Sequence, residues 1–299
     1  ATNTTGGSNT AVGIQALNSN TTASNNTAVG KFALIANTTG TQNVAVGANA
    51  LDANTTASNN TAIGYDSLGL NTTGTFNSAV GSEALRQNTT GGSNTAVGLN
   101  ALQQNTTASN NTALGTSALG VNTTGANNVA VGMNTADANT TGSAITAVGA
   151  GALGANTTGG SNTALGNTAL AGNTTASNNT AVGTGSLFAN TTGGENTAVG
   201  AFALDANTTA SNNTAVGYLS LTTNQTGTNN TAIGRSALAT STASENTAVG
   251  ASAMIANTTG ANNTAVGKGA LETNTTANNN TAVGREALNV NTTGEQNTA

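Results

Sequence analysis

The 299-residue chain contains no cysteine, proline, histidine or tryptophan, and only 5% of its residues are charged and 2% aromatic. Ser-His-Asp and Cys-His centres and the common transition-metal sites depend on imidazole or thiolate groups, so these absences exclude them. The 10 acidic residues are scattered along the chain, and no acid–base pair recurs from repeat to repeat. We therefore expect no enzymatic activity, no cofactor and no bound metal.

Charge is scarce as well: 5 Lys and Arg against 10 Asp and Glu give a formal net charge of −5. So few basic residues cannot follow a phosphate backbone, which excludes nucleic acid as a partner. No apolar run approaches the roughly 18 residues of a membrane helix, so we expect no membrane insertion in this segment. Disordered chains usually combine high net charge with few aliphatic residues, whereas aliphatic residues recur here at fixed places.

One phrase fills the whole chain. It reads Asn-Thr-Thr-(Gly/Ala)-x-x-Asn-Thr-Ala-(Val/Ile/Leu)-Gly-x-x-Ala-Leu-x-x and recurs every seventeen residues, except for one interval of sixteen between Asn230 and Asn246. The Gly and Ala versions roughly alternate, as at Gly6 and Ala23, which gives a weaker double period. A helical-hairpin repeat needs a longer unit, whereas Thr, Val and Ile with Asn-rich corners suit short strands and turns. The pattern predicts an all-β fold, a parallel β-solenoid or β-roll of about 17-residue coils forming an elongated rod.

We expect residues 1–299 to form a single repeat array of about 17.5 coils without caps. Irregular coils are expected near 133–146, where the consensus fails at four places, and near 239–246, where one residue is missing. The chain starts and stops in mid-repeat, which we interpret as coils that continue elsewhere or that pair end to end with another chain.

The direction of each side chain follows from the variability of the repeats. Every charged and every aromatic residue falls at a non-consensus place, so these places face outward. A strand alternates its faces, so Thr10 and Val12 share one side while Ala11 and Gly13 share the other. We assign the Thr10 side to the interior. The predicted core residues are Val12, Val29, Val46, Ile63, Val80, Leu17, Leu34 and Leu51.

The alanine of the strand never changes among the repeats, although this assignment points it outward. Because this position is always alanine, we predict that another copy of the chain packs closely against it, since larger side chains would not fit in a close-packed contact. The predicted interchain contact residues are Ala11, Ala28, Ala45, Ala130, Ala147 and Ala164. We therefore expect a homo-oligomer.

The two asparagines of each repeat are expected to form ladders in which each amide bonds its counterpart one coil away. The predicted ladder residues are Asn3, Asn20, Asn37, Asn54, Asn9, Asn26, Asn43 and Asn60. Contact with a host or surface ligand is expected at the variable places, where the candidates are Phe32, Tyr65, Phe202 and Tyr218. The glycosylation pattern Asn-x-Thr is interpreted as a by-product of the repeat.

The phrase Asn-Thr-Ala-Val-Gly-x-x-Ala-Leu, linked by Asn-Thr-Thr-Gly, resembles the head repeats of trimeric autotransporter adhesins such as the Yersinia adhesin. It is also similar to repeat tracts of bacteriophage tail fibres and bacterial surface fibres. The resemblance implies a left-handed parallel β-roll, with three chains packed side by side outside the cell or on a virion. The repeat unit here is longer than the commonest head repeat.

Together these features predict a structural, self-assembling repeat segment of an extracellular fibre or adhesin, either a trimer or an end-to-end filament. The alternative is an ice-binding or carbohydrate-binding β-solenoid that uses a regular Thr/Asn face. Ice binders of this shape usually show Thr-x-Thr in every coil on an exposed strand. Here Thr-Thr is followed by Gly or Ala, and Thr10 is expected to lie inside.

Overall fold

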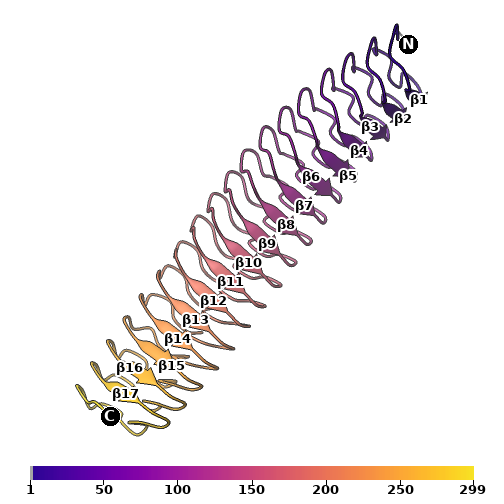
Figure 1. Ribbon diagram of the computed structural model, residues 1–299. Coiled ribbons are helices and arrows are strands. Elements are labelled where there is room, and N and C mark those ends of the chain that lie inside the picture. The colour runs from indigo at the N-terminus through magenta and orange to yellow at the C-terminus, as the bar shows by residue number, and fades with distance from the viewer. Residues whose placement is uncertain (1–2) are drawn as a thin grey trace. The chain divides into compact units, whose positions relative to one another are not determined.

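The computed structural model describes residues 3–299. The chain divides into two compact units, Ala1–Ile145 and Thr146–Ala299. Each unit is a stack of coils, and each coil carries one three-residue strand (Figure 1). The part of the chain from residue 3 onward contains no helix. The predicted all-β, parallel β-solenoid of about 17-residue coils is confirmed.

The strands of the first unit are β1 Thr10–Val12, β2 Thr27–Val29, β3 Val44–Val46, β4 Thr61–Ile63, β5 Ser78–Val80, β6 Thr95–Val97, β7 Thr112–Leu114 and β8 Val129–Val131. Those of the second unit are β9 Thr146–Val148, β10 Thr163–Leu165, β11 Thr180–Val182, β12 Thr197–Val199, β13 Thr214–Val216, β14 Thr231–Ile233, β15 Thr247–Val249, β16 Thr264–Val266 and β17 Thr281–Val283.

Within each unit every strand pairs in parallel and in register with the strand one coil away. In β2 and β3, for example, Ala28 lies opposite Ala45. The pairing of β14 with β15 keeps this register although the repeat between them is one residue short, since Thr231 lies opposite Thr247. The missing residue is therefore absorbed outside the sheet.

The interior is built from small side chains. We call the residues at one place of successive coils a column, and name it after its member in the coil of residues 20–36. The columns that face inward are those of Asn20, Ala23, Asn26, Ala28, Ala33 and Leu34. Leucine is the only large side chain among them, and Leu17, Leu34 and Leu51 are 4%, 0% and 0% exposed. Most coils therefore enclose one leucine, two asparagines and a few methyl groups. The exceptions are Ala136 and Met254 in the leucine column and Ser241 and Ile145 in the asparagine columns.

The assignment of the Val29 column to the core is wrong. In β2 the side chain of Ala28 is buried, whereas Thr27 and Val29 on either side of it are partly exposed. The other predicted core residues of this column also face outward, namely Val12, Val46, Ile63 and Val80. Alternation shows which residues share a side, but available space decides which side is internal. Beside two asparagines and a leucine there is room for a methyl group only.

The predicted interchain role of the alanines is wrong for the same reason. Ala28, Ala45, Ala130, Ala147 and Ala164 are all 0% exposed and lie inside the coils. Ala11, in the first strand, is exposed. The invariance of the column thus reflects packing within one chain, because a larger side chain would overfill the interior.

The corners of the coil need unusual backbone conformations. Gly30 has a φ of +137°, and a Cβ atom placed there would lie 2.4 Å from the carbonyl oxygen of Gly47. Both the conformation and the contact demand glycine. Leu34, with a φ of 52°, is in the left-handed region as well. This conformation costs a leucine about 1–2 kcal/mol, which its burial offsets.

Candidate interaction surface

The internal hydrogen bonds show which polar groups the fold itself uses. Asn37 Nδ2 donates to Asn20 Oδ1 at 3.3 Å and to Gly40 O at 3.0 Å. Its Oδ1 accepts from Asn54 Nδ2 at 2.9 Å. Asn20 Nδ2 in turn donates to Asn3 Oδ1 at 3.0 Å, so Asn3, Asn20, Asn37 and Asn54 form an amide-to-amide ladder. A buried amide is tolerated here because its donors and acceptor are matched.

The second asparagine column is linked differently. Asn43 donates its backbone N–H to Asn26 Oδ1 at 2.9 Å and its Nδ2 to Ala57 O at 2.8 Å. Asn9 and Asn60 take part in the same pattern, in which the side-chain oxygen accepts from the backbone of the next coil. For these residues the expected amide-to-amide bond is replaced by a side-chain-to-backbone bond.

Ile145 stands where this column otherwise has asparagine. Its backbone N–H still donates to Asn128 Oδ1 at 2.9 Å, but its buried side chain has no oxygen to continue the series. Ile145 is also the last residue of the first unit. The ladder of that unit therefore ends at its boundary.

The short coil loses one threonine but keeps two of its bonds to the following coil. Ser241 takes the place of the first asparagine, and its Oγ accepts from Asn257 Nδ2 at 3.2 Å. Thr242 Oγ1 donates to Thr258 O at 3.3 Å, as the Thr21 column does elsewhere. The missing residue is thus the member of the Thr22 column.

The double period has a structural cause. The backbone N–H of Gly7 donates to Ser24 Oγ at 3.0 Å, and that of Thr41 donates to Ser58 Oγ at 2.9 Å. The serine that follows Ala in one version of the repeat therefore accepts a hydrogen bond from a backbone N–H group of the Gly version in the preceding coil. Sequence comparison detected the alternation but not this bond.

Threonines of the Thr21 column are also used internally. Thr21 Oγ1 donates to Thr38 O at 3.2 Å, and Thr38 Oγ1 donates to Thr55 O at 3.1 Å. What remains for contact with other molecules is the outer surface, which includes the three surfaces described below.

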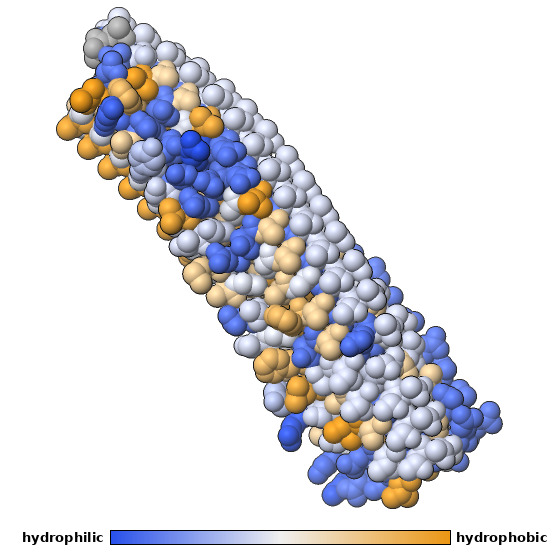
Figure 2. Space-filling view, turned by 180° about the vertical axis from the view of Figure 1, so that it is seen from behind, coloured by the Kyte–Doolittle hydropathy of each residue, from blue (hydrophilic) through white to orange (hydrophobic). Residues whose placement is uncertain are grey.

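The first surface, the aliphatic row, is the Val29 column. It carries Val, Ile or Leu in every strand, and its members include Ile63 (39% exposed), Leu114 (47%), Leu165 (47%) and Ile233 (39%). The Thr27 column lies beside it on the same outward side of the strands. Figure 2 shows hydrophobic side chains in a regular row along the upper left edge of the view, in the first unit.

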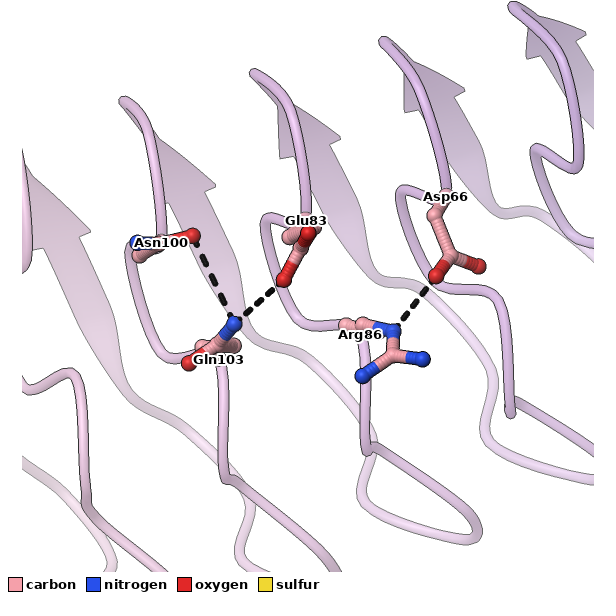
Figure 3. Close-up of polar contacts among 5 residues, drawn as sticks. All are labelled: Asp66, Glu83, Arg86, Asn100 and Gln103. Atoms are coloured by element: carbon pink, nitrogen blue, oxygen red, sulfur yellow. Dashed lines mark hydrogen bonds and ion pairs between the residues drawn. The ribbon is translucent and has the colours of Figure 1, made fainter.

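The second surface, the variable face, consists of the Lys31, Phe32, Ile35 and Ala36 columns. Arg86 Nε lies 2.5 Å from Asp66 Oδ2 in the coil before it, and Gln103 Nε2 donates to Glu83 Oε2 at 2.5 Å in the same diagonal way (Figure 3). Partial burial and the nearby charge of Asp66 raise the pKa of Asp52 above its usual value. Polar contacts on this face thus join neighbouring coils.

The four predicted contact residues lie on the variable face. Tyr65, Phe202 and Tyr218 are 53%, 41% and 48% exposed, and Phe32 is half-buried under Lys31 Nζ, which lies 4.6 Å from its ring centre. Phe32 and Tyr65 belong to the first unit, and Phe202 and Tyr218 to the second.

The third surface, the threonine row, is the Thr22 column. Its members are exposed in every coil that has one. The sequence already suggested a regular Thr/Asn face as an alternative, and the structure shows that the second threonine of each Thr-Thr pair is the exposed one.

No pocket and no group of three or more potential metal ligands occurs among residues 3–299. The same residues include no helix that is long and apolar enough to span a membrane. Comparison with protein-family models, with curated proteins and with solved structures gave no match for this chain.

Proposed function

We propose that this chain is a structural repeat segment of an extracellular fibre or adhesin, and that copies of it associate side by side through the aliphatic row. The observation that carries the proposal is the row itself, an outward-facing aliphatic side chain that is partly or largely exposed in every strand. Contiguous exposed apolar surface usually marks a contact with another molecule. The role is mechanical, without catalysis or cofactor.

A second copy of the chain is the partner that fits this row best. Two identical rows have the same spacing from coil to coil, so each aliphatic side chain meets an equivalent one. Burial of a Val or Leu stabilises by about 1.5–3 kcal/mol, so covering the half-exposed side chains contributes roughly 1 kcal/mol per coil. Repetition over the strands of one unit makes a weak contact strong.

The setting of the proposal comes from the repeat phrase. Its resemblance to adhesin heads and phage fibres supports a location outside the cell, on a cell surface or on a virion. The same resemblance favours three chains per assembly, and the variable face is where a host or surface ligand would bind. The low charge and the close packing of backbone and small side chains suit a passive spacer.

The test places charges in the row. The triple substitution Val80→Lys, Val97→Lys and Leu114→Lys should convert the assembled protein to a monomer in analytical ultracentrifugation, because three ammonium groups cannot be buried unpaired. Far-UV circular dichroism should still show the β-solenoid, since these side chains point outward. Unchanged association of a folded triple variant would refute side-by-side assembly through this row.

The matched control is Ser82→Lys, Leu99→Lys and Thr116→Lys. These residues occupy the same three coils on the variable face, where Lys31 and Lys268 already stand in the same column. The control adds equal charge, so it should leave the assembly intact. Dissociation of the control as well would show that charge alone, and not the row, governs association.

A further inference from the structure

The threonine row keeps its residue type while its neighbours diverge. Its members are Thr5, Thr22, Thr39, Thr56, Thr73, Thr90, Thr107, Thr124, Thr141, Thr158, Thr175, Thr192, Thr209, Thr226, Thr259, Thr276 and Thr293. No coil has serine or valine at this place. In the same coils the Lys31 column ranges from Tyr65 to Ala150 and Arg235. The exposed residues of the Lys31 column have therefore diverged among the repeats. A residue type that stays constant at an exposed place indicates a selected contact.

The fold does not use these hydroxyl groups. Among residues 3–299, no hydroxyl of the threonine row takes part in a hydrogen bond within the chain, whereas the adjacent Thr21 column bonds along the stack. The invariance of the Thr21 column is explained by that bond. For the threonine row, the internal structure supplies no such reason, and the unused donors and acceptors point toward the solvent.

The backbone holds the row at a fixed spacing. The backbone N–H groups of Thr38 and Thr39 both donate to Thr55 O, at 2.9 Å and 3.3 Å, and the same fork recurs along each unit. Coils therefore follow one another at the β-sheet repeat of about 4.8 Å. Within each unit the result is a regular line of hydroxyl and methyl groups without charges or aromatic rings. In Figure 2 a broad pale area of the surface lies beside an area of mixed blue and orange side chains.

From these observations we propose that the threonine row, with the half-exposed Thr21 column beside it, binds the surface of ice. A single hydroxyl contact is weak, so only a rigid ligand that repeats with the same spacing gains from all of them at once. The oxygen rows of the ice lattice have a repeat close to that of a β-sheet. A polysaccharide chain is the less suitable occupant, because there is neither a cleft nor an aromatic platform in this row.

The ice-binding proposal does not depend on side-by-side assembly, because it uses a different surface. The test measures thermal hysteresis and inhibition of ice recrystallisation by the full chain. The unmodified protein should show both effects. Thr73→Lys, Thr90→Lys and Thr107→Lys should abolish them, since long charged side chains prevent a flat fit. Absence of both effects in the unmodified protein, or their retention in this folded variant, would overturn the proposal.

The control Ser82→Lys, Leu99→Lys and Thr116→Lys changes the same coils and should retain the full effect on ice. A finer variant, Thr73→Ser, Thr90→Ser and Thr107→Ser, keeps the hydroxyls and removes the methyl groups, and it should show a reduced effect. Ultracentrifugation of all variants separates the two proposals, because threonine-row variants should still assemble. Binding to insoluble chitin or cellulose without any effect on ice would assign the row to a polysaccharide and contradict this inference.

Discussion

At the residue scale, the Ala33 column contains three serines in unequal environments. Ser186 Oγ donates to Gly183 O at 2.9 Å, and Ser220 Oγ donates to Gly217 O at 3.0 Å. Ser67 Oγ is the only buried side-chain N or O atom without a hydrogen-bond partner in the part of the chain that the structure describes. A buried hydroxyl without a partner lowers stability, because it has lost its bonds to water.

Ser67→Ala should therefore raise the free energy of unfolding by about 1 kcal/mol, since alanine is the usual residue of this column and removes the unsatisfied group. Urea denaturation followed by circular dichroism measures the change. Ser186→Ala is the matched control and should lower stability by about 1 kcal/mol, because it removes a bond that is made. A loss of stability in both variants would mean that Ser67 also has a partner.

At the scale of the single coil, the asparagine ladders replace much of the apolar core that a solenoid of this width lacks. Asn105 Nδ2 donates to Asn88 Oδ1 at 2.8 Å and to Ala108 O at 3.0 Å, and its Oδ1 accepts from Asn122 Nδ2 at 3.2 Å. One side chain thus connects three successive coils. Removing it leaves several buried groups without partners.

We expect Asn105→Ala to lower the free energy of unfolding by about 2–4 kcal/mol, measured by urea denaturation, because each buried group that loses its partner adds to the cost. Asn105→Ser should cost less. Ser241 already occupies this column and accepts from Asn257 Nδ2, so a hydroxyl can replace the amide oxygen as the acceptor for the following coil. Equal losses in the two variants would show that packing volume, and not hydrogen bonding, makes asparagine necessary.

At the scale of the whole molecule, charge contributes little to the fold. Residues 3–299 contain two ion pairs, Arg86 with Asp66 and the exposed pair Arg285 with Glu286. Burial raises the pKa of Asp137, and burial together with Asp66 raises that of Asp52, above the ordinary 3.8. The native state therefore holds these two protons more tightly than the unfolded chain does.

Stability should accordingly rise as the pH falls from neutral through the raised pKa values of Asp52 and Asp137, and level off below the ordinary value of 3.8. Most proteins show the reverse, because their paired carboxylates lose partners on protonation. Urea midpoints across this range provide the measurement. The double variant Asp52→Asn and Asp137→Asn should lose most of the rise, and a steep loss of stability in acid would contradict the prediction.

The sequence by itself determined the architecture, because a seventeen-residue period with strand-forming residues leaves few folds open. It also identified the outward places of charged and aromatic residues and the columns of Leu17 and Asn20. Tertiary structure alone decided which side of the strand is internal. Ala28 and Val29 are both apolar, and the alternation of side chains along a strand does not show which of them is buried. The space left by the neighbouring asparagines and leucines accommodates the methyl group of Ala28 but not the larger side chain of Val29. The aliphatic row follows from that choice, because the Val29 column faces outward once the Ala28 column faces inward.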